Sequence, residues 1–252
     1  MNTENQTAQS HPEEKTALIT GGAGGIGWGI AVALARAGYR VAITDLGQHR
    51  LDEALAREDS QPAIVARSCD VTDRDQVAQL FDWFMDRFGR LDVLSNNAGI
   101  NVVRREVSEL DPDDWDRIMN VNCTGTFNCI KAALPIMRKQ HGGLIVNTVS
   151  IAGKRALTLA GGAYAAAKFG QGALGLIVGQ EEAEHGIRVT NIYPGEVATG
   201  LLAQRPVPVS QERRAQMVQP ENIGDCVVHV ASMPPTVTIP ELVITPVYQK
   251  YY

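Results

Sequence analysis

The sequence is poor in the residues that staple small proteins or hold metal ions. It has four cysteines, Cys69, Cys123, Cys129 and Cys226. None of them forms a Cys-x-x-Cys pair or stands beside histidine at the spacing of metal ligands. We therefore expect free thiols in a reducing compartment, with neither a disulfide framework nor a metal site.

Long apolar runs and an excess of positive charge are also missing. No run of about 18 apolar residues occurs, so no membrane-spanning helix is predicted. Residues 1–14 are polar and do not resemble a signal peptide. A net charge of −5 with 44% hydrophobic residues argues against a nucleic-acid binder and against disorder. We expect a cytoplasmic protein with a flexible tail at 1–14 and one domain at 15–252.

Short β-branched runs alternate with longer segments of helical periodicity. The pattern predicts strands at 16–20, 40–44, 63–67, 91–95, 143–147, 187–192 and 242–245, and helices at 26–37, 71–88, 113–140 and 162–185. Repeated strand–helix–strand units predict an α/β fold of the Rossmann type: a doubly wound, seven-stranded, mostly parallel sheet with helices on both faces. Such sheets bind ligands beyond the carboxyl ends of their strands.

A cluster of glycines lies between the first predicted strand and the first predicted helix. Gly22, Gly24 and Gly27 satisfy the pattern GxGxxG, and Gly21, Gly25 and Gly27 satisfy the related GxxxGxG. Missing side chains let a pyrophosphate approach the backbone, and the helix N-terminus supplies N–H donors. Tight turns also require glycine, but this position favours a dinucleotide phosphate loop.

An acidic residue ends the second predicted strand. Asp45 lies 20 residues beyond Gly25, where a carboxylate accepts hydrogen bonds from the adenosine ribose and repels a 2′-phosphate. The glycine loop contains no lysine or arginine to offset that repulsion, so NAD is expected and NADP is less favoured. His49 and Arg50 nearby keep NADP open, and a solvated aspartate in a turn is the structural alternative.

Tyr164 and Lys168 share one face of the predicted helix 162–185, because they are one helical turn apart. A phenol titrates at a pKa of about 10, so it is a poor base at neutral pH. A neighbouring ammonium favours the phenolate, and we therefore expect Lys168 to lower the pKa of Tyr164. Taken alone, a Tyr–Lys pair is more often a surface contact than a catalytic pair.

Taken together, the motifs change that weighting. The sequence resembles the short-chain dehydrogenase/reductase family of the Tyr-x-x-x-Lys type over nearly all of residues 16–231. The matching segments, in the family's order and spacing, are Thr20-Gly-x-x-x-Gly-Ile-Gly27, Asp70, Asn96-Asn-Ala-Gly99, Asn122, Ser150, Tyr164-x-x-x-Lys168, and Pro194-Gly195 with Thr199.

The resemblance implies a catalytic role for four residues. Tyr164 would be the general acid in reduction and the base in oxidation. Lys168 would lower the pKa of Tyr164 and bind the nicotinamide ribose. Ser150 would hold the substrate oxygen, and Asn122 would anchor a water that links Lys168 to solvent. A turn residue at Ser150 and a simple helix interruption at Asn122 are the structural alternatives.

The resemblance also implies which residues contact the cofactor. Asp70 would bind adenine beside Val71, and Gly99 would leave room for the adenosine ribose. The complete set expected to contact NAD is Gly21, Ala23, Gly24, Gly25, Ile26, Gly27, Asp45, Leu46, Asp70, Val71, Asn97, Ala98, Gly99, Tyr164, Lys168, Pro194, Gly195, Val197 and Thr199. A helix cap at Asp70 and an ordinary turn at 97–99 are the alternatives.

Two features depart from the family's common pattern. The separation between Ser150 and Tyr164 is one residue longer than usual, and the chain ends in Ile239-Pro-Glu-Leu-Val-Ile-Thr-Pro246 and Tyr251-Tyr252 where many members have a glycine-rich motif. The resemblance implies a homotetramer or homodimer that pairs through helices 113–140 and 162–185. The unusual ending leaves the subunit contact near the C-terminus open.

The predicted function is reversible hydride transfer between a nicotinamide cofactor and a small alcohol or ketone. A 3-oxoacyl-carrier-protein reductase is the alternative, and a non-catalytic nucleotide sensor is disfavoured because the four catalytic residues are all present. The substrate site is expected at 101–105, after Ser150, and under a lid at 196–218. These segments contain seven cationic residues: Arg104, Arg105, Lys154, Arg155, Arg205, Arg213 and Arg214. They would attract an anionic substrate, or they are surface charges that are simply solvated.

Overall fold

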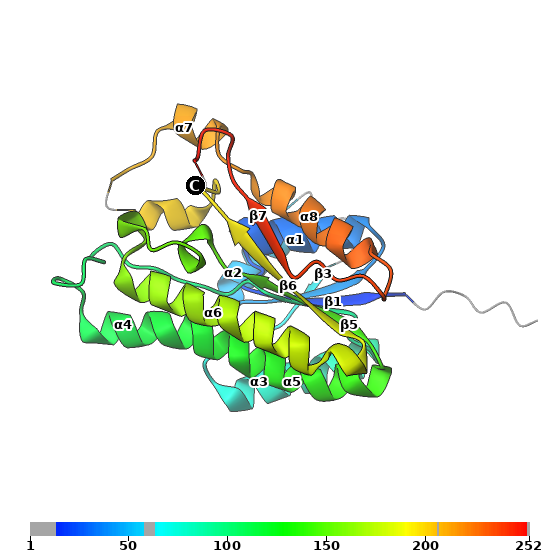
Figure 1. Ribbon diagram of the computed structural model, residues 1–252. Coiled ribbons are helices and arrows are strands. Elements are labelled where there is room, and N and C mark those ends of the chain that lie inside the picture. Colours follow the sequence, from blue (N-terminus) through cyan, green and yellow to red (C-terminus); the bar gives the residue numbers. More distant parts are fainter. Residues whose placement is uncertain (1–13, 58–63, 206, 251–252) are drawn as a thin grey trace, which may run out of the picture.

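Seven parallel strands form the centre of the fold. The computed structural model describes residues 14–57, 64–205 and 207–250. Over these residues the strands pair in the order β3-β2-β1-β4-β5-β6-β7 (Figure 1). Their bounds are β1 (Thr16–Thr20), β2 (Arg40–Thr44), β3 (Ile64–Ala66), β4 (Val93–Asn96), β5 (Gly143–Thr148), β6 (Ile187–Pro194) and β7 (Glu241–Ile244). The predicted doubly wound sheet is confirmed, and the strand order reverses between β1 and β4.

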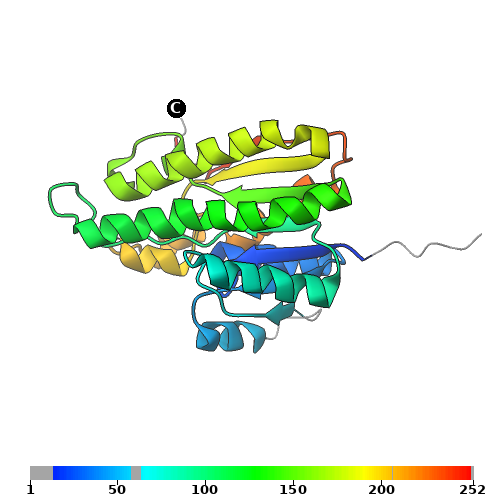
Figure 2. The ribbon, with the colours of Figure 1, turned by 90° about the horizontal axis from the view of Figure 1, so that it is seen from below.

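Helices cover both faces of the sheet. Helices α1, α2 and α8 pack on the face that presents Ala17 and Ile19. Helices α3, α5 and α6 pack on the face that presents Leu18 and Leu94, and they lie side by side in Figure 2. The bounds are α1 (Gly25–Arg36), α2 (Gln48–Leu55), α3 (Arg74–Phe88), α4 (Pro112–Met119), α5 (Gly125–Gln140), α6 (Gly162–Glu181), α7 (Gln211–Ala215) and α8 (Pro220–Ser232). Alternate residues of β1 therefore supply opposite cores.

Several helix boundaries differ from the predictions. Helix α3 begins at Arg74, because the Asp73 side chain accepts hydrogen bonds from the amides of Asp75 and Gln76 and caps the helix there. The predicted helix 113–140 is divided by a π-helical turn, η1 (Asn120–Thr124). The predicted helix 162–185 ends at Glu181 and is followed by a 3₁₀ turn, η4 (Ala183–His185).

A chain of buried asparagine side chains fixes α6 to the sheet. Asn96, Asn147 and Asn191 stand at matching positions on β4, β5 and β6. The amide of Asn96 donates to Asn147 at 3.0 Å, Asn147 donates to Asn191 at 2.9 Å, and Asn191 donates to the Gly172 carbonyl of α6 at 2.8 Å. A methyl group at Gly175 would overlap the Asn191 side chain, so α6 approaches the sheet closely only because glycine stands there. This chain sets the position of the helix that carries Tyr164.

The predicted lid, 196–218, contains two short helical segments. They are a 3₁₀ segment, η5 (Gly200–Gln204), and α7, and Val197 pairs with Val218 where the excursion leaves and rejoins the sheet. The predicted N-terminal tail lies outside the described residues except for Glu14. Within the described ranges, no helix is both long and apolar enough to cross a membrane.

Candidate active site

A cleft of about 710 Å³ lies beyond the carboxyl ends of the strands. Its volume is typical of a cofactor site. Nearly all of the predicted site residues line it, from the glycine loop at one end to Ser150 and Tyr164 near the other. Three predicted residues do not line it: Ala23, Gly27 and Asn122. Each of the three contacts a residue that does line the cleft: Ala23 contacts Asp45, Gly27 contacts Gly21, and Asn122 contacts Ile100.

The glycine loop has the geometry of a phosphate cradle. Gly21 and Gly25 adopt φ angles of 61° and 52°, in the left-handed region that favours glycine. A methyl group at Gly27 would overlap the carbonyl oxygen of Gly21, whereas one at Gly24 would meet open space. No side chain caps the N-terminus of α1, so its first amides and the open backbone suit a pyrophosphate.

Asp45 stands at the end of β2, where the ribose hydroxyls are expected. The carboxylate accepts a hydrogen bond from the Leu46 amide at 2.9 Å and lies 3.4 Å from the Ala23 amide. Arg50 forms an ion pair with it at 2.9 Å, with a guanidinium side chain that is 62% exposed. The sequence shows that Arg50 is nearby but not that it is bound to the carboxylate, and this pair offsets part of the negative charge.

Asp70 and Asn97 complete this end of the cleft. One carboxylate oxygen of Asp70 accepts hydrogen bonds from the amide and hydroxyl of Thr72. Asp73, not Asp70, caps α3, so the alternative role for Asp70 is excluded. The Thr20 hydroxyl accepts the amides of Asn97 and Ala98 at 3.0 and 3.1 Å and joins the ends of β1 and β4. Thr20 therefore has a positioning role that its place in the motif did not reveal.

Ser150, Tyr164 and Lys168 meet in the cleft wall. Ser150 and Tyr164 both line the cleft, and Ser150 is close enough to the phenol to lower its pKa. The Ser150 hydroxyl also accepts the Ala152 amide at 3.1 Å. The Nζ atom of Lys168 lies 5.7 Å from the centre of the Tyr164 ring. The predicted grouping is therefore present, and the predicted turn contact of Ser150 exists beside it.

The pKa values of this pair differ in part from expectation. Burial raises the pKa of Tyr164, and the neighbouring Ser150 hydroxyl and the charge of Arg105 oppose that rise only partly. Burial lowers the pKa of Lys168 to about 7. Lys168 is only 3% exposed. Burial strengthens the electrostatic effect of its protonated form on Tyr164, but it also makes that protonated form less stable. The net lowering of the Tyr164 pKa that the sequence predicts is not present in the protein alone.

A buried polar chain holds Lys168. Its Nζ donates to the Thr148 carbonyl at 2.8 Å and to the Gln171 side chain at 2.7 Å. Gln171 in turn donates to the Thr126 hydroxyl at 2.9 Å, and that hydroxyl donates to the Asn122 carbonyl at 3.1 Å. Gln171 is fully buried one turn after Lys168 on α6. Helical spacing from Lys168 is the signal that would have found it.

Asn122 occupies the π-helical turn behind the cleft. Its side chain accepts the Ile100 amide at 2.7 Å and donates to the Ile100 carbonyl at 2.9 Å. A methyl group at Gly99 would lie 3.3 Å from Asn122 Oδ1 and 3.6 Å from Lys168 Nζ. Asn122 thus fixes the strand end that passes between it and the cleft. Its predicted role as a water anchor remains a prediction.

Glu196 organises the substrate end. Its carboxylate accepts Arg205 at 3.0 Å, Arg213 at 2.9 Å and the Tyr248 hydroxyl at 2.6 Å. The Glu196 amide donates to Gln249 at 2.9 Å. Burial opposes ionisation of Glu196, but these hydrogen bonds and charges outweigh it and lower the pKa. The C-terminal segment is therefore bound to the lid of the same chain, a contact that the sequence analysis did not predict.

Known proteins resemble this chain over most of its length. The short chain dehydrogenase family matches residues 15–207. An uncharacterized oxidoreductase from Staphylococcus saprophyticus is 32% identical over 237 residues, which cover 93% of this chain and 98% of the relative. An alcohol dehydrogenase from the archaeon Thermococcus sibiricus, complexed with 5-hydroxy-NADP, superposes with a TM-score of 0.83 at 29% identity and covers 94% of this chain and 99% of its own.

A variant of actinorhodin polyketide ketoreductase with NADPH superposes equally well. Its TM-score is 0.84 at 29% identity, with 94% of this chain and 98% of that chain covered. The family match covers most of the chain, and both solved structures hold a nicotinamide cofactor or its derivative. The protein is therefore an NAD(P)-dependent oxidoreductase, and it belongs to the short-chain dehydrogenase family.

Proposed function

We propose that the protein interconverts a secondary alcohol and a ketone, with Tyr164 as the general acid and base and NAD as the preferred cofactor. The observation that carries this proposal is the meeting of Ser150, Tyr164 and Lys168 in one wall of the cleft that begins at the glycine loop. Oxidation of a CH–OH carbon removes a hydride and a proton. The cofactor supplies the hydride chemistry when bound, and the protein must handle the proton.

Tyr164 handles that proton in the proposed mechanism. In oxidation the substrate hydroxyl gives its proton to the Tyr164 oxygen, and in reduction the phenol returns it to the carbonyl oxygen. The Ser150 hydroxyl donates a hydrogen bond to the substrate oxygen and holds the substrate beside Tyr164. Burial raises the pKa of Tyr164 in the free protein, so a nearby cation has to favour the phenolate during oxidation. Lys168, held by Thr148 and Gln171, is the group placed to do so.

The residues that would hold the cofactor are those of the glycine end. The amides at the start of α1 would take the pyrophosphate, Asp45 the adenosine ribose, and Asp70 with Val71 the adenine. Asn97 and Ala98 would pass beneath the adenosine ribose where Gly99 leaves room. Pro194, Val197 and Thr199 would border the nicotinamide. The open space at Gly24 and the left-handed Gly25 fit this assignment.

A comparison of Tyr164→Phe with Tyr39→Phe tests the catalytic assignment. The substrate is first found by following NADH formation over a panel of secondary alcohols, polyols and hydroxyacids. Tyr164→Phe is expected to lower kcat by at least about 100-fold, since it removes only the transferable proton. NADH binding, measured by fluorescence titration, should stay unchanged. Tyr39 lies outside the cleft lining, so its variant should retain full turnover; equal turnover in both variants would overturn the assignment.

The cofactor preference has a separate test. The carboxylate of Asp45 repels a 2′-phosphate, although its ion pair with Arg50 weakens the repulsion. NADH is therefore expected to bind more tightly than NADPH in equilibrium titrations. Tighter binding of NADPH, together with turnover of an acetoacetyl thioester, would favour the alternative role as a 3-oxoacyl-carrier-protein reductase.

We also propose that the protein is a homodimer or homotetramer. Large apolar side chains are exposed on the two helices expected to pair, namely Phe127 on α5 and Phe169, Leu176 and Ile177 on α6. Exposed apolar residues grouped on adjacent helices are typical of a subunit interface. Light scattering should give a mass at least twice that of one chain, and Ile177→Glu should reduce it.

A further inference from the structure

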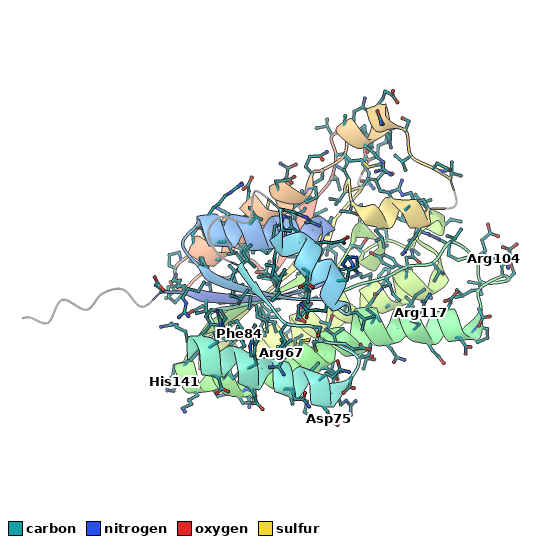
Figure 3. All side chains as sticks on the ribbon, turned by 180° about the vertical axis from the view of Figure 1, so that it is seen from behind. Arg67, Asp75, Phe84, Arg104, Arg117 and His141 are labelled. Atoms are coloured by element: carbon teal, nitrogen blue, oxygen red, sulfur yellow. The ribbon has the colours of Figure 1, made fainter. Side chains whose placement is uncertain are left out.

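Arg105 is a buried cation beside the proposed catalytic residues. Its exposed fraction is only 8%, whereas the neighbouring Arg104 is exposed and lies at the edge of the molecule in Figure 3. Arg105 lines the cleft together with Tyr164, and its charge is among the influences that lower the pKa of that phenol. Burial of a guanidinium is costly unless an anion or several hydrogen bonds compensate it.

The protein compensates Arg105 only in part. Its two Nη groups donate to the carbonyl oxygens of Leu159, at 3.1 Å, and Gln204. The Nε atom is buried and finds no hydrogen-bond partner among the described residues. No carboxylate in the described ranges forms an ion pair with Arg105. Neutral carbonyls do not cancel a full charge, so the site has one uncompensated positive charge.

The one carboxylate among the described residues that line this end of the cleft already has cationic partners. Glu196 is paired with both Arg205 and Arg213, and the charge of Arg205 itself acts unfavourably on Arg105. The other carboxylates that line the cleft, Asp45 and Asp70, belong to the adenosine end. The substrate end is therefore cationic, and an anion that enters with the substrate would be the counter-charge.

Apolar side chains also line this end of the cleft, among them Ile100, Ile151, Leu157, Leu159 and Leu202, beside the polar Asn101 and Gln204. The cleft of about 710 Å³ has to hold the cofactor as well, so the remaining space suits a short hydrocarbon with one charged group. A carboxylate is a small planar anion that matches a guanidinium and forms short, charge-assisted hydrogen bonds with it.

We propose that Arg105 binds the carboxylate of the substrate, so that the protein acts on short hydroxyacids and oxoacids. The inference rests on the proposed function, because it places the carboxylate near the alcohol carbon whose hydroxyl exchanges its proton with Tyr164. It extends that function by naming the substrate class. In the oxidative direction a hydroxyacid would lose a hydride to NAD⁺ and its hydroxyl proton to the Tyr164 phenolate, and the products would be the oxoacid, NADH and the neutral phenol.

Matched acid and ester substrates test this assignment by turnover. The probes are 2- and 3-hydroxyacids of about four to six carbons and their methyl esters, which lack the charge and carry one additional methyl group. The wild-type protein should favour at least one acid over its ester in kcat/KM. Arg105→Gln should lower kcat/KM for that acid by at least about 30-fold, as expected when one partner of a buried charge pair is removed. The value for the ester should change little.

Two further variants separate binding from structure. Arg105→Lys keeps the charge but loses the planar fork, so it should retain part of the acid preference. Arg104→Gln removes the adjacent exposed charge, and it should leave the acid-to-ester ratio at the wild-type value. Because Arg105 also joins the segments that contain Leu159 and Gln204, the Tm of each variant is measured. If Arg105→Gln does not fold, Arg105→Lys and the wild-type ratio still decide the question.

A binding measurement decides the inference without turnover. In the presence of NADH, butanoate should raise the Tm of the wild-type protein more than butanamide, and Arg105→Gln should remove the difference. Oxidation of esters and uncharged alcohols with no preference for acids would overturn the role of Arg105 and leave the proposed function intact. Turnover of no alcohol at all would overturn the proposed function, and an absent butanoate effect would then overturn the role of Arg105 as well.

Discussion

The two ends of the cleft are built in different ways. The adenosine end is made mostly of backbone at the ends of β1, β2 and β4, with Gly21 and Gly25 in left-handed conformations. The substrate end is made of side chains from segments far apart in the sequence, such as Glu196 and Tyr248, which meet at 2.6 Å. The strand ends of the sheet would thus bind the cofactor, which is common to the family. The segments that leave the sheet would bind the substrate, which differs between members.

The two ends also differ in charge. Asp45 and Asp70 place carboxylates at the adenosine end, where hydroxyl and amino groups of a nucleoside are expected to donate hydrogen bonds. Arg105 and Arg205 place cations at the substrate end, and only Arg205 has a carboxylate partner among the described residues. Under the proposal for Arg105, charge as well as shape would therefore direct the cofactor and the substrate to their own ends of the cleft.

The largest effect is expected from a single methyl group at the adenosine end. In Gly27→Ala the new methyl would overlap the Gly21 carbonyl and the Asn97 amide, so the loop and α1 must move apart. A displacement of about 1 Å costs roughly 100-fold in rate, and we expect kcat/KM for the cofactor to fall by that factor. Steady-state kinetics with NAD⁺ and thermal unfolding would measure the change.

Gly47→Ala provides the matched control for that variant. A methyl group there meets nothing within 4 Å, and the backbone of Gly47 has a φ of −110°, which alanine adopts readily. The control should therefore keep wild-type kinetics. If Gly27→Ala behaves like Gly47→Ala, close contact between the loop and α1 does not matter for cofactor use.

A smaller effect, of a different kind, is expected from Gln171 at the catalytic end. Gln171→Leu removes a hydrogen-bond acceptor from the buried Lys168 ammonium and should lower its pKa further below about 7. Gln171→Glu adds a negative charge and should raise it. The pH dependence of kcat should therefore shift in opposite directions in the two variants, each by about one pH unit, since a hydrogen bond to a charged group contributes roughly that much.

Opposite shifts distinguish a positioning role from simple packing. A loss of packing would lower the Tm of both variants without moving their pH profiles apart. Gln180→Leu, on an exposed position of the same helix, is the control for adding leucine to α6, and its pH profile should match the wild type. Identical profiles in all three variants would show that Gln171 does not act on Lys168.

The adenosine end of the cleft could be predicted from the sequence much better than the substrate end. The strands, the glycine loop and Asp45 were predicted because local patterns determine them: short β-branched runs, glycine spacing and the residue at a strand end. Helix α2 was missed because only Leu51 and Ala54 of its eight residues are buried, which is too few for a periodic signal. Helix α8 was missed although Pro220 and the capping box of Gln219 with Asn222 mark its start.

The substrate end could not be predicted in the same way. Arg104 and Arg105 are adjacent and chemically identical, yet only Arg105 turns inward. Glu196 receives its partners from a loop, from α7 and from the C-terminal segment. No local pattern encodes such contacts, because they arise only after the sheet has brought the excursions together. The asparagine chain that holds α6 is hidden from the sequence for the same reason.

The smallest effect is expected from the network around Glu196. Replacement by glutamine keeps the shape of the side chain and removes the charge shared by Arg205, Arg213 and Tyr248. The Arg213 side chain is 45% exposed, so solvent screens part of the interaction, and we expect a loss of about 1 kcal/mol, or a fall in Tm of roughly 2–4 °C. A looser lid should raise the substrate KM about threefold, with kcat nearly unchanged.

The pH dependence of the Tm tests whether the charge of Glu196 causes this stabilisation. The folded protein lowers the pKa of Glu196, so the network stabilises the protein while the carboxylate is ionised and loses that effect as the pH falls through the lowered pKa. The Tm difference between the wild type and Glu196→Gln should therefore shrink on acidification. Glu184→Gln, an exposed control, should show no difference at any pH. A constant difference for Glu196→Gln would mean that packing, not charge, ties the C-terminal segment to the lid.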